Sequence, residues 1–523
     1  SVSILLIFLS IIVLFIISFF TLKIYEKINS DRFKFFNKVN NYLQKLLNIK
    51  TIYIILFLFI VSFLPRLLYI NDGLLHHDSV QAAIATEQTL ETGKLHGIVG
   101  YRYGFVLLNA IAYFIPHFIF GVQSSELTIT LVTILFASLS IVLIYLFVKE
   151  LLNDNYIALS SSLLFTFFPI YLAVTTYAKD HALSVFLILL SAYFLIKSLK
   201  TDSAIYKTLF GVSLGFSLFV RVSDIFVSFP LFIILYFFPS KLIDEGLIKF
   251  KKRFDVKHLM IISIPIFLAL ILFFIVQGGA ISGGIAGNKF LSPNGNFFDI
   301  ILSLMMTFTP LGFFLIAYGL FNSYRKNPYM ASMLFIWFLT VFIFYSSFGT
   351  SKMRFFLPLL IPLAILMGIS IHALRERYTI FSPVALIVVL ILMFSLIQPT
   401  LAYRHDYSAG KELAKFVAEN TENNSIIVDY GDLGVFYNYY GNRNTIECPF
   451  IEKPEQLAET IDKINNALEQ NIPVYLNNQC FGFQTEEGPG KVIDIFNKNY
   501  DFLNIGEVSF ENYEDIMKVS PNK

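Results

Sequence analysis

Four short polar clusters interrupt an otherwise apolar sequence, and their residue types suit a transfer reaction that involves a phosphate. The first is Leu75-His76-His77-Asp78-Ser79, in which Asp78 comes shortly after an apolar segment. An ionisable residue near or inside a membrane is costly, so it is by default a candidate for function. The other clusters, in chain order, are Tyr177-Ala178-Lys179-Asp180-His181, the pair Arg221 and Asp224, and Lys352-Met353-Arg354; Arg102 lies between the first two.

Acids and cations would have different tasks in such a reaction. A carboxylate can take the proton from an attacking hydroxyl when the two are within hydrogen-bond reach. Arg and Lys can hold a phosphate as it departs with growing negative charge. Structural explanations exist as well, because lysines and arginines at span ends extend to lipid headgroups. Lys179 beside Asp180 would suit a solvated turn, and Arg221 could simply pair with Asp224.

A metal site is an alternative for the first cluster, since His76 and His77 could bind a divalent ion together with Asp78. Adjacent histidines point in different directions along the chain, which favours polar loop roles for them. We therefore expect no required cofactor, and we name Asp78 and His77 as the ligands if a metal binds.

The elements that must position these residues are predicted to be membrane helices. Of the 523 residues, 56% are hydrophobic and 15% charged, and the mean hydropathy is +0.67. Many stretches reach about twenty apolar residues, the length that crosses a bilayer, and they predict a polytopic α-helical membrane protein with about 12 spans. The first of these apolar stretches lacks the basic segment and cleavage site of a signal peptide, so we interpret it as a retained span. The spans lie near residues 3–22, 52–70, 127–148, 156–175, 181–197, 207–222, 225–238, 259–277, 299–321, 329–348, 355–373 and 380–400.

The loops between these spans alternate in charge. Basic residues dominate loops 23–50 and 239–258 and the short loops near residues 149, 197–200, 325–326 and 375–377. By the positive-inside rule these loops face the cytoplasm. Loops 71–126, 176–180, 278–298 and 349–354 and the segment 401–523 then lie outside. All four polar clusters fall at this external membrane edge, which favours one shared site over four separate structural roles.

Two of the external loops have distinctive compositions. In the first loop, residues 71–126, the second half (104–121) is apolar but interrupted by Asn109, Pro116 and His117. This pattern suits helices that lie in the membrane interface. A real span there would instead invert the sidedness of every later helix. Loop 278–298 is rich in glycine and is predicted to be a mobile lid over an external site.

The C-terminal segment differs from the rest of the chain in charge. Residues 401–523 carry 20 acidic and 10 basic residues, whereas the other 400 carry 17 acidic and 29 basic ones. Helical spacing over 411–419 and 454–470 alternates with short β-branched runs at 425–429 and 474–476, which predicts a small open α/β sheet. Both cysteines, Cys448 and Cys480, lie here. They could form a disulfide in an oxidising exterior or remain buried thiols.

Taken in order, the motifs resemble those of the GT-C superfamily of membrane glycosyltransferases, especially the protein O-mannosyltransferase and aminoarabinose-transferase-like branch (glycosyltransferase family 39-like). The resemblance covers about residues 52–450, with its early acidic motif at Asp78 and its second loop at 176–180. Residues 354–360, Arg-Phe-Phe-Leu-Pro-Leu-Leu, look like the family's Arg-Tyr-Leu-Leu-Pro segment. The run ending Tyr439-Tyr440-Gly441 resembles the soluble C-terminal domains of many members. One departure is Ser79, where the family commonly has Glu after the acid, and this weakens a metal site.

The resemblance implies a GT-C fold and an inverting transferase. It would use a polyprenyl-phosphate sugar of the dolichyl or undecaprenyl type and a protein, glycan or lipid acceptor, within the plasma membrane and without nucleic acid. Three domains are expected: an extra helix and basic loop (1–50), the catalytic membrane domain (51–403) and an extracytoplasmic α/β domain (404–523). A transporter or flippase of lipid-linked sugars is the alternative; it would need ionisable residues deep within the spans.

Each candidate residue receives a role from this resemblance. Asp78 is expected to be the general base, and Asp180 to shape the acceptor side or orient Lys179. The remaining candidates divide into two groups: Lys179, Arg354, Lys352, Arg221 and Arg102 for the donor phosphate, and His76, His77 and Tyr177 for the acceptor or the loop shape.

Overall fold

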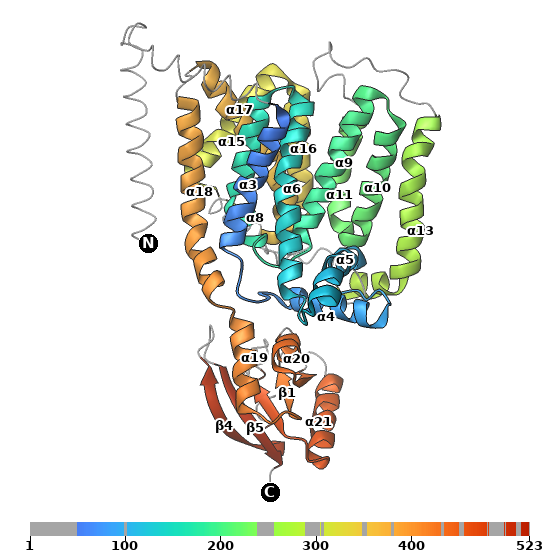
Figure 1. Cartoon of the computed structure of the whole chain (residues 1–523), viewed down its shortest axis with the longest axis vertical. Coiled ribbons are helices and arrows are strands. Elements are labelled where there is room, and N and C mark those ends of the chain that lie inside the picture. Colours follow the sequence, from blue (N-terminus) through green and yellow to red (C-terminus); the bar gives the residue numbers. More distant parts are fainter. Residues whose placement is uncertain are drawn as a thin grey trace. The chain divides into compact units, whose positions relative to one another are not determined.

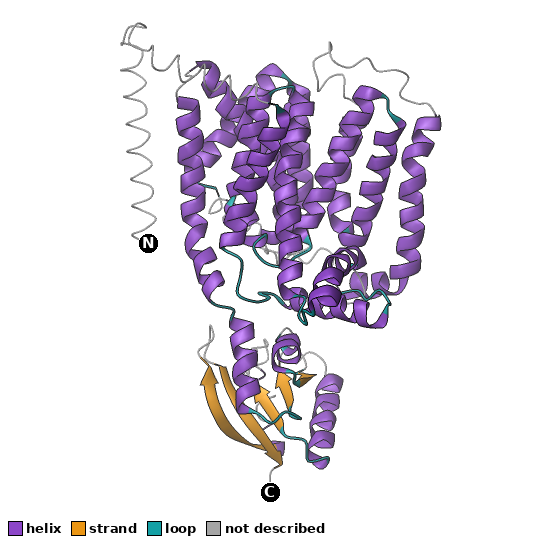
Figure 2. Ribbon diagram, in the orientation of Figure 1, coloured by secondary structure: helices purple, strands orange, loops and turns teal. Residues whose placement is uncertain are grey.

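The protein is described from a computed structural model, in which helices predominate and one small sheet lies near the C-terminus (Figures 1 and 2). The chain divides into two compact units. Unit 1 contains most of the apolar helices, and unit 2 combines residues 69–99 and 106–131 with residues 401–523. The structure describes residues 50–98, 102–237, 256–287, 304, 308–347, 353–377, 381–429, 433–448, 454–477, 480, 496, 498–508 and 514–521.

The predicted membrane helices are present wherever the structure describes their residues. Seven described helices are long and apolar enough to cross a bilayer, and three shorter apolar helices accompany them. This confirms a polytopic helical membrane protein, although the expected number of about 12 spans is not reached within the described residues; segment 3–22 lies outside them. The helices of this part are α3 (Thr51–Leu68), α6 (Glu126–Leu152), α7 (Asn155–Phe167), α8 (Pro169–Val174), α9 (His181–Thr201), α10 (Ala204–Val220), α11 (Val222–Phe237), α13 (Val256–Gly287), α15 (Pro310–Lys326), α16 (Pro328–Ser347), the 3₁₀-helix η2 (Met353–Phe356), α17 (Leu357–Arg377) and α18 (Phe381–Asp406).

Three predicted boundaries were wrong. Helix α15 begins only at Pro310, within the expected span 299–321, and Phe308 and Thr309 just before it are not helical. The expected span 156–175 consists of two helices, because the chain leaves helical geometry at Phe168 (ψ 120°) and restarts with Pro169 at the first position of α8. Proline disfavours helix at the residue before it, which explains the break. The glycine-rich segment expected to begin a lid at residue 278 continues as helix α13 to Gly287. The rest of the expected lid, residues 288–298, lies outside the described residues.

Helix α17 forms the centre of unit 1 and packs against α7 and α15. Two glycines allow this close approach. A Cβ atom at Gly319 of α15 would lie 1.9 Å from the carbonyl oxygen of Leu366, and one at Gly368 of α17 would lie 2.1 Å from Oγ of Ser161. Small residues of this kind let membrane helices pack backbone to backbone.

The tail, residues 404–523, folds as the predicted α/β sheet. Its strand order is β2-β1-β3-β5-β4, with β1 parallel to β2 and β3, and β5 antiparallel to β3 and β4. The predicted helices and strands at 411–419, 425–429, 454–470 and 474–476 are all present. The elements are α19 (Ala409–Asn420), β1 (Ile426–Asp429), α20 (Gly434–Gly441), β2 (Asn444–Glu447), α21 (Pro454–Glu469), β3 (Val474–Asn477), β4 (Tyr500–Val508) and β5 (Glu514–Pro521).

Polar groups in the tail have specific partners. Glu422 accepts hydrogen bonds from Tyr475 and from Nζ of Lys518, and these bonds lower the pKa of its carboxyl to about 2. Cys448 and Cys480 are free thiols in the apolar core of the sheet. Burial, followed by the neighbouring Cys448 thiol, raises the pKa of Cys480, so the Cys480 sulfur is held in the unreactive protonated form.

The first loop contains two helices, α4 (His77–Thr92) and α5 (Tyr103–Phe120). Helix α5 is continuous despite Asn109 and Pro116, and its length and hydropathy are sufficient for a span. Its assignment to the membrane interface therefore stays a prediction. Helix α4 is polar and begins at the first polar cluster.

Candidate functional site

The second polar cluster lies in a buried turn between α8 and α9 of unit 1. Lys179 is 2% exposed and Asp180 1% exposed. Thr133 of α6 fixes the turn on both sides, since its hydroxyl accepts from the backbone N–H of Lys179 at 3.2 Å and donates to the carbonyl of the same residue at 3.4 Å. The solvated-turn explanation for Lys179 and Asp180 is therefore wrong.

Two arginines from distant parts of the sequence converge on Asp180. Nε of Arg102 lies 3.4 Å from Oδ2 of the carboxylate, and Nη1 of Arg221 lies 3.5 Å from the same oxygen. Arg102 adopts a φ of 62°, which non-glycine residues rarely do. Backbone strain of this kind persists where the surroundings impose it, often at functional sites. The side chain of Asp224, the other possible partner of Arg221, is not among those described.

His181 and Phe355 extend this cluster. Nη1 of Arg221 lies 3.3 Å from Nε2 of His181. Because a guanidinium can only donate, His181 must be neutral with its proton on Nδ1. The Phe355 ring is contacted by the guanidinium carbons of Arg221 at 5.1 Å and of Arg354 at 5.4 Å, both measured to the ring centroid. It also stacks on Tyr345 with centroids 5.7 Å apart.

Four cations thus gather around His181 in unit 1, and two of them pair with the carboxylate of Asp180. We call Arg102, Lys179, Arg221 and Arg354 the cation cluster; each of them acts electrostatically on His181. Within the described residues of this turn, Asp180 is the acid that opposes them. Arginine and lysine side chains bind anions through charge-assisted hydrogen bonds, so this arrangement is suited to receive an anion. Guanidinium groups match phosphate oxygens particularly well.

A fully buried arginine supports the same turn. Nε of Arg66 in α3 donates to Oγ1 of Thr175 at 2.7 Å, and Nη1 donates to the carbonyl and hydroxyl of Ser62 at 2.8 and 2.9 Å. Its guanidinium also lies 5.2 Å from the ring centroid of Tyr171. Arg66 therefore ties α3 to the end of α8, just ahead of Lys179 and Asp180.

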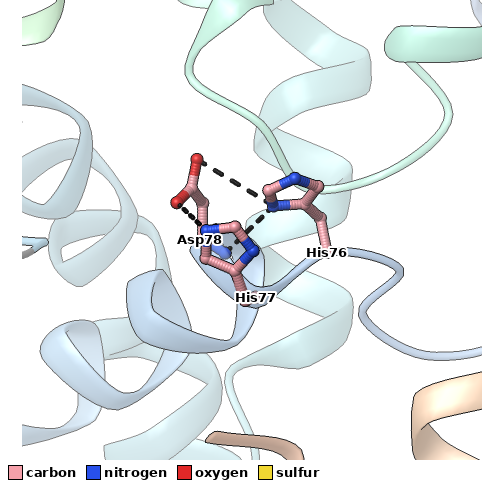
Figure 3. A group of neighbouring side chains, drawn as sticks. All are labelled: His76, His77 and Asp78. Carbon is pink, nitrogen blue, oxygen red and sulfur yellow. Dashed lines mark hydrogen bonds and ion pairs between the residues drawn. The ribbon is translucent and has the colours of Figure 1, made fainter. Parts of the chain in front are cut away.

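The first polar cluster belongs to unit 2 and begins helix α4 (Figure 3). Nδ1 of His76 accepts from the backbone N–H of Asp78 at 3.1 Å and so caps the helix. Nε2 of His77 lies 2.9 Å from Oδ1 of Asp78. The two imidazole rings have centroids 4.1 Å apart. This first-loop cluster holds the Asp78 carboxylate in the first turn of α4, at the positive end of the helix dipole.

The donor atoms of the first-loop cluster also suit a divalent metal. One ligand atom from each of His76, His77 and Asp78 lies within 4.8 Å of the others, and two histidines with one carboxylate are a set that binds Zn²⁺. Nδ1 of His76, however, already accepts the capping hydrogen bond. A metal at that atom would remove the cap from α4, whereas a metal at Nε2 of His76 would leave the cap in place.

The predicted residues therefore divide between two clusters in separate units. Asp180, Lys179, Arg221, Arg102 and Arg354 come together in unit 1, and His76, His77 and Asp78 in unit 2. Tyr177 is 6% exposed in the buried turn, and Lys352 lies outside the described residues.

Sequence reasoning missed the aromatic part of the site. Phe355 contacts Arg221 and Arg354 and stacks on Tyr345, and His181 lies edge-on to Phe355 with centroids 5.6 Å apart. An arginine next to two phenylalanines, as in Arg354-Phe355-Phe356, is a signal for cation–π contact that was available in the sequence.

Two sequence comparisons point to proteins that transfer sugars. A family described as dolichyl-phosphate-mannose-protein mannosyltransferase matches residues 110–274. The dolichyl-phosphooligosaccharide-protein glycotransferase 1 of Archaeoglobus fulgidus is 34% identical over 103 residues. That match spans 19% of this chain and only 17% of the relative's length.

Solved structures resemble most of the chain. ArnT from Cupriavidus metallidurans, bound to undecaprenyl phosphate, aligns with a TM-score of 0.63 and 11% identity over 88% of this chain and 97% of that one. The Archaeoglobus fulgidus oligosaccharyltransferase in complex with Zn and sulfate has a TM-score of 0.56 and 12% identity, covering 81% and 68%. AglB of that organism, with an inhibitory peptide and a dolichol-phosphate, has a TM-score of 0.55 and 11% identity, covering 82% and 69%.

Proposed function

Since this chain has the fold of the GT-C membrane glycosyltransferases, we propose that it moves a monosaccharide from a polyprenyl-phosphate carrier to an acceptor hydroxyl. The observation that carries this proposal is the cation cluster, in which Arg102 and Arg221 already share the carboxylate of Asp180. Lys179 and Arg354 add positive charge near the same buried turn. The phosphate of a lipid carrier would accept charge-assisted hydrogen bonds from these guanidinium and ammonium groups.

The chemical step is a single displacement that inverts the anomeric carbon. Asp78 takes the proton of the acceptor hydroxyl, and the hydroxyl oxygen forms a bond to the anomeric carbon. The bond between that carbon and the phosphate oxygen breaks, and its electron pair leaves with the lipid phosphate. The cation cluster stabilises this departing charge, whereas His77, 2.9 Å from Oδ1, orients the carboxylate of Asp78.

The finer features of the reaction are proposals. Undecaprenyl phosphate and dolichol-phosphate in the related structures support a donor of the polyprenyl-phosphate class, and we propose that it carries a hexose or a pentose. The acceptor is a protein, a glycan or a lipid. We place the enzyme in the plasma membrane with both clusters extracytoplasmic, and we expect transfer to continue without added metal.

Substitution of Asp78 tests the base. Asp78→Asn should abolish transfer of a radiolabelled sugar from its polyprenyl phosphate, because an amide cannot accept the proton. Glu91→Gln is the matched control, since it removes an exposed carboxylate from the same helix. Near-normal turnover in Asp78→Asn would refute the assignment, and sugar that crosses vesicles without product would indicate a transporter.

Substitution of Arg354 tests the phosphate site. Arg354→Ala should weaken binding of the polyprenyl phosphate by about tenfold or more, as expected for loss of one charged hydrogen-bond donor. Arg325→Ala is the matched control and should leave this binding unchanged. Arg325 also lies over a phenylalanine ring, with 5.7 Å to the centroid, but at the opposite end of the α15–α17 pair. Equal binding by the two variants would remove Arg354 from the site.

A further inference from the structure

The backbone just ahead of Asp78 is held by the tail. The N–H of Leu74 donates to the hydroxyl of Tyr440 at 2.8 Å, and Nζ of Lys411 lies 2.6 Å from Oδ1 of Asp72. Gly73, between them, has a φ of 84°, and a Cβ atom there would lie 2.7 Å from Cδ of Lys411. These contacts all lie within unit 2 and leave this segment little freedom to move.

Tyr440 connects three elements through one oxygen. Its hydroxyl accepts from Leu74 and donates to Oε2 of Glu126, 2.8 Å away, at the start of α6. Burial, followed by the charge of Glu126, raises the pKa of Tyr440, so the hydroxyl keeps its proton and remains a donor. Lys411 completes the arrangement, with Nζ 5.9 Å from the centroid of the tyrosine ring and 3.8 Å from Glu126.

The contacts of Tyr440 and Lys411 form a first tether between the tail and the first loop, and a second tether lies after Asp78 in the sequence. The hydroxyl of Tyr439 donates to Oε1 of Glu87 at 3.0 Å, and the same oxygen accepts the N–H of Ser125 at 2.8 Å. Glu87 lies on α4, the helix that carries Asp78 in its first turn, and α20 packs against that helix (Figure 1). Asp78 is therefore flanked by tail contacts on both sides in sequence.

We infer that the tail is part of the catalytic apparatus, with Tyr440 and Tyr439 as positioning residues that hold Asp78 in place. The inference rests on the proposed function, in which Asp78 is the base. A tail used only to recognise acceptors would not need two hydroxyls hydrogen-bonded to the base-bearing loop. A displacement of about 1 Å at a catalytic group can lower the rate by as much as a hundredfold, so loss of one tether should be measurable.

The test is Tyr440→Phe in the full-length protein in lipid nanodiscs. We expect the single-turnover transfer rate to fall about tenfold, while the KM for the polyprenyl-phosphate sugar changes less than twofold. Hydrogen–deuterium exchange should show faster exchange at Leu74, because its amide loses its acceptor. Tyr475→Phe is the matched control: it removes a tyrosine hydroxyl that is bonded to Glu422 inside the tail and should change neither readout.

A second variant guards against misfolding. Lys411→Met removes the ion pair with Asp72 and should reproduce the lower rate and the faster exchange with unchanged thermal unfolding of the tail. A Tyr440→Phe rate within twofold of wild type, or unchanged exchange at Leu74, would overturn the positioning role. If the wild-type protein transfers no sugar, the proposed function fails instead, and the exchange data still decide whether the tail holds the loop.

Discussion

Removal of the Asp180 carboxylate should tighten phosphate binding while weakening the fold. Asp180 pairs with Arg102 at 3.4 Å and with Arg221 at 3.5 Å. At an effective dielectric constant of about 20, each pair is worth roughly 5 kcal/mol before desolvation. Removing one partner of a buried pair usually destabilises a protein by about 3–5 kcal/mol, because the other charge is left uncompensated. We therefore expect Asp180→Asn to unfold at a lower temperature.

A bound phosphate would replace the lost carboxylate and recover part of that free energy. Suppose the substitution destabilises the fold by about 4 kcal/mol and the bound phosphate recovers about a third of that free energy. Polyprenyl phosphate would then bind roughly tenfold more tightly to Asp180→Asn than to the wild type. Titration calorimetry in nanodiscs measures the affinity, and thermal unfolding with and without ligand measures the stability. Transfer should nevertheless slow, because the arginines lose the carboxylate that orients them and the product phosphate is retained.

Asp154→Asn is the control for this variant. Asp154 caps α7 and lies 3.1 Å from Nε2 of His372. Its loss should lower stability without changing phosphate affinity. Weaker binding of polyprenyl phosphate to Asp180→Asn than to wild type would refute the view that the carboxylate and the phosphate share the same cations.

Three further predictions concern other parts of the molecule. Gly73→Ala should lower the transfer rate about tenfold or more, as measured by single-turnover kinetics. The new Cβ would clash with Lys411, and alanine disfavours the left-handed backbone conformation at this position. Arg66→Met should reduce activity with little change in donor affinity, whereas Arg66→Lys, which keeps a donor for Thr175, should restore part of it. Glu422, whose pKa is lowered to about 2, stabilises the tail above the usual carboxyl pKa of about 4.3. This contribution is lost as the pH falls from there toward 2, and because the side chain is half-exposed it is about 1 kcal/mol or less. Acid unfolding of Glu422→Gln should be correspondingly less sensitive to pH.

Local patterns were sufficient to predict most helices and the central strands of the tail. Long apolar runs define membrane helices, and short β-branched runs between helices define β1 and β3. Strands β4 and β5 were missed because their sequences do not alternate cleanly. Strand β4 also contains a register irregularity between Asn504 and Gly506, and such a bulge disrupts the two-residue period.

Only those parts of the candidate site that lie within a single loop could be predicted from the sequence. Lys179 and Asp180 are adjacent in a turn, and the sequence indicated them directly. The pairing of Asp180 with Arg102 and Arg221, and the contact between Tyr440 and Glu126, depend on residues far apart in the chain. No local period encodes such contacts, since they arise only when helices with their own propensities pack together.

The glycines at the contacts of α17 with α15 and α7 have a practical consequence for handling the protein in detergent. Membrane helices associate largely by close packing rather than by the hydrophobic effect, so we expect the contacts of Gly319 and Gly368 to be less sensitive to the surrounding lipid than lipid-exposed helices are. In the most apolar part of the continuous stretch Met353–Arg377, which includes α17, 89% of the residues are buried, whereas the share is 22% in α3 and 22% in the stretch that includes α18. Solubilisation should therefore preserve the α7–α15–α17 assembly and loosen α3 and α18 first, so activity lost on extraction should return when lipid is restored.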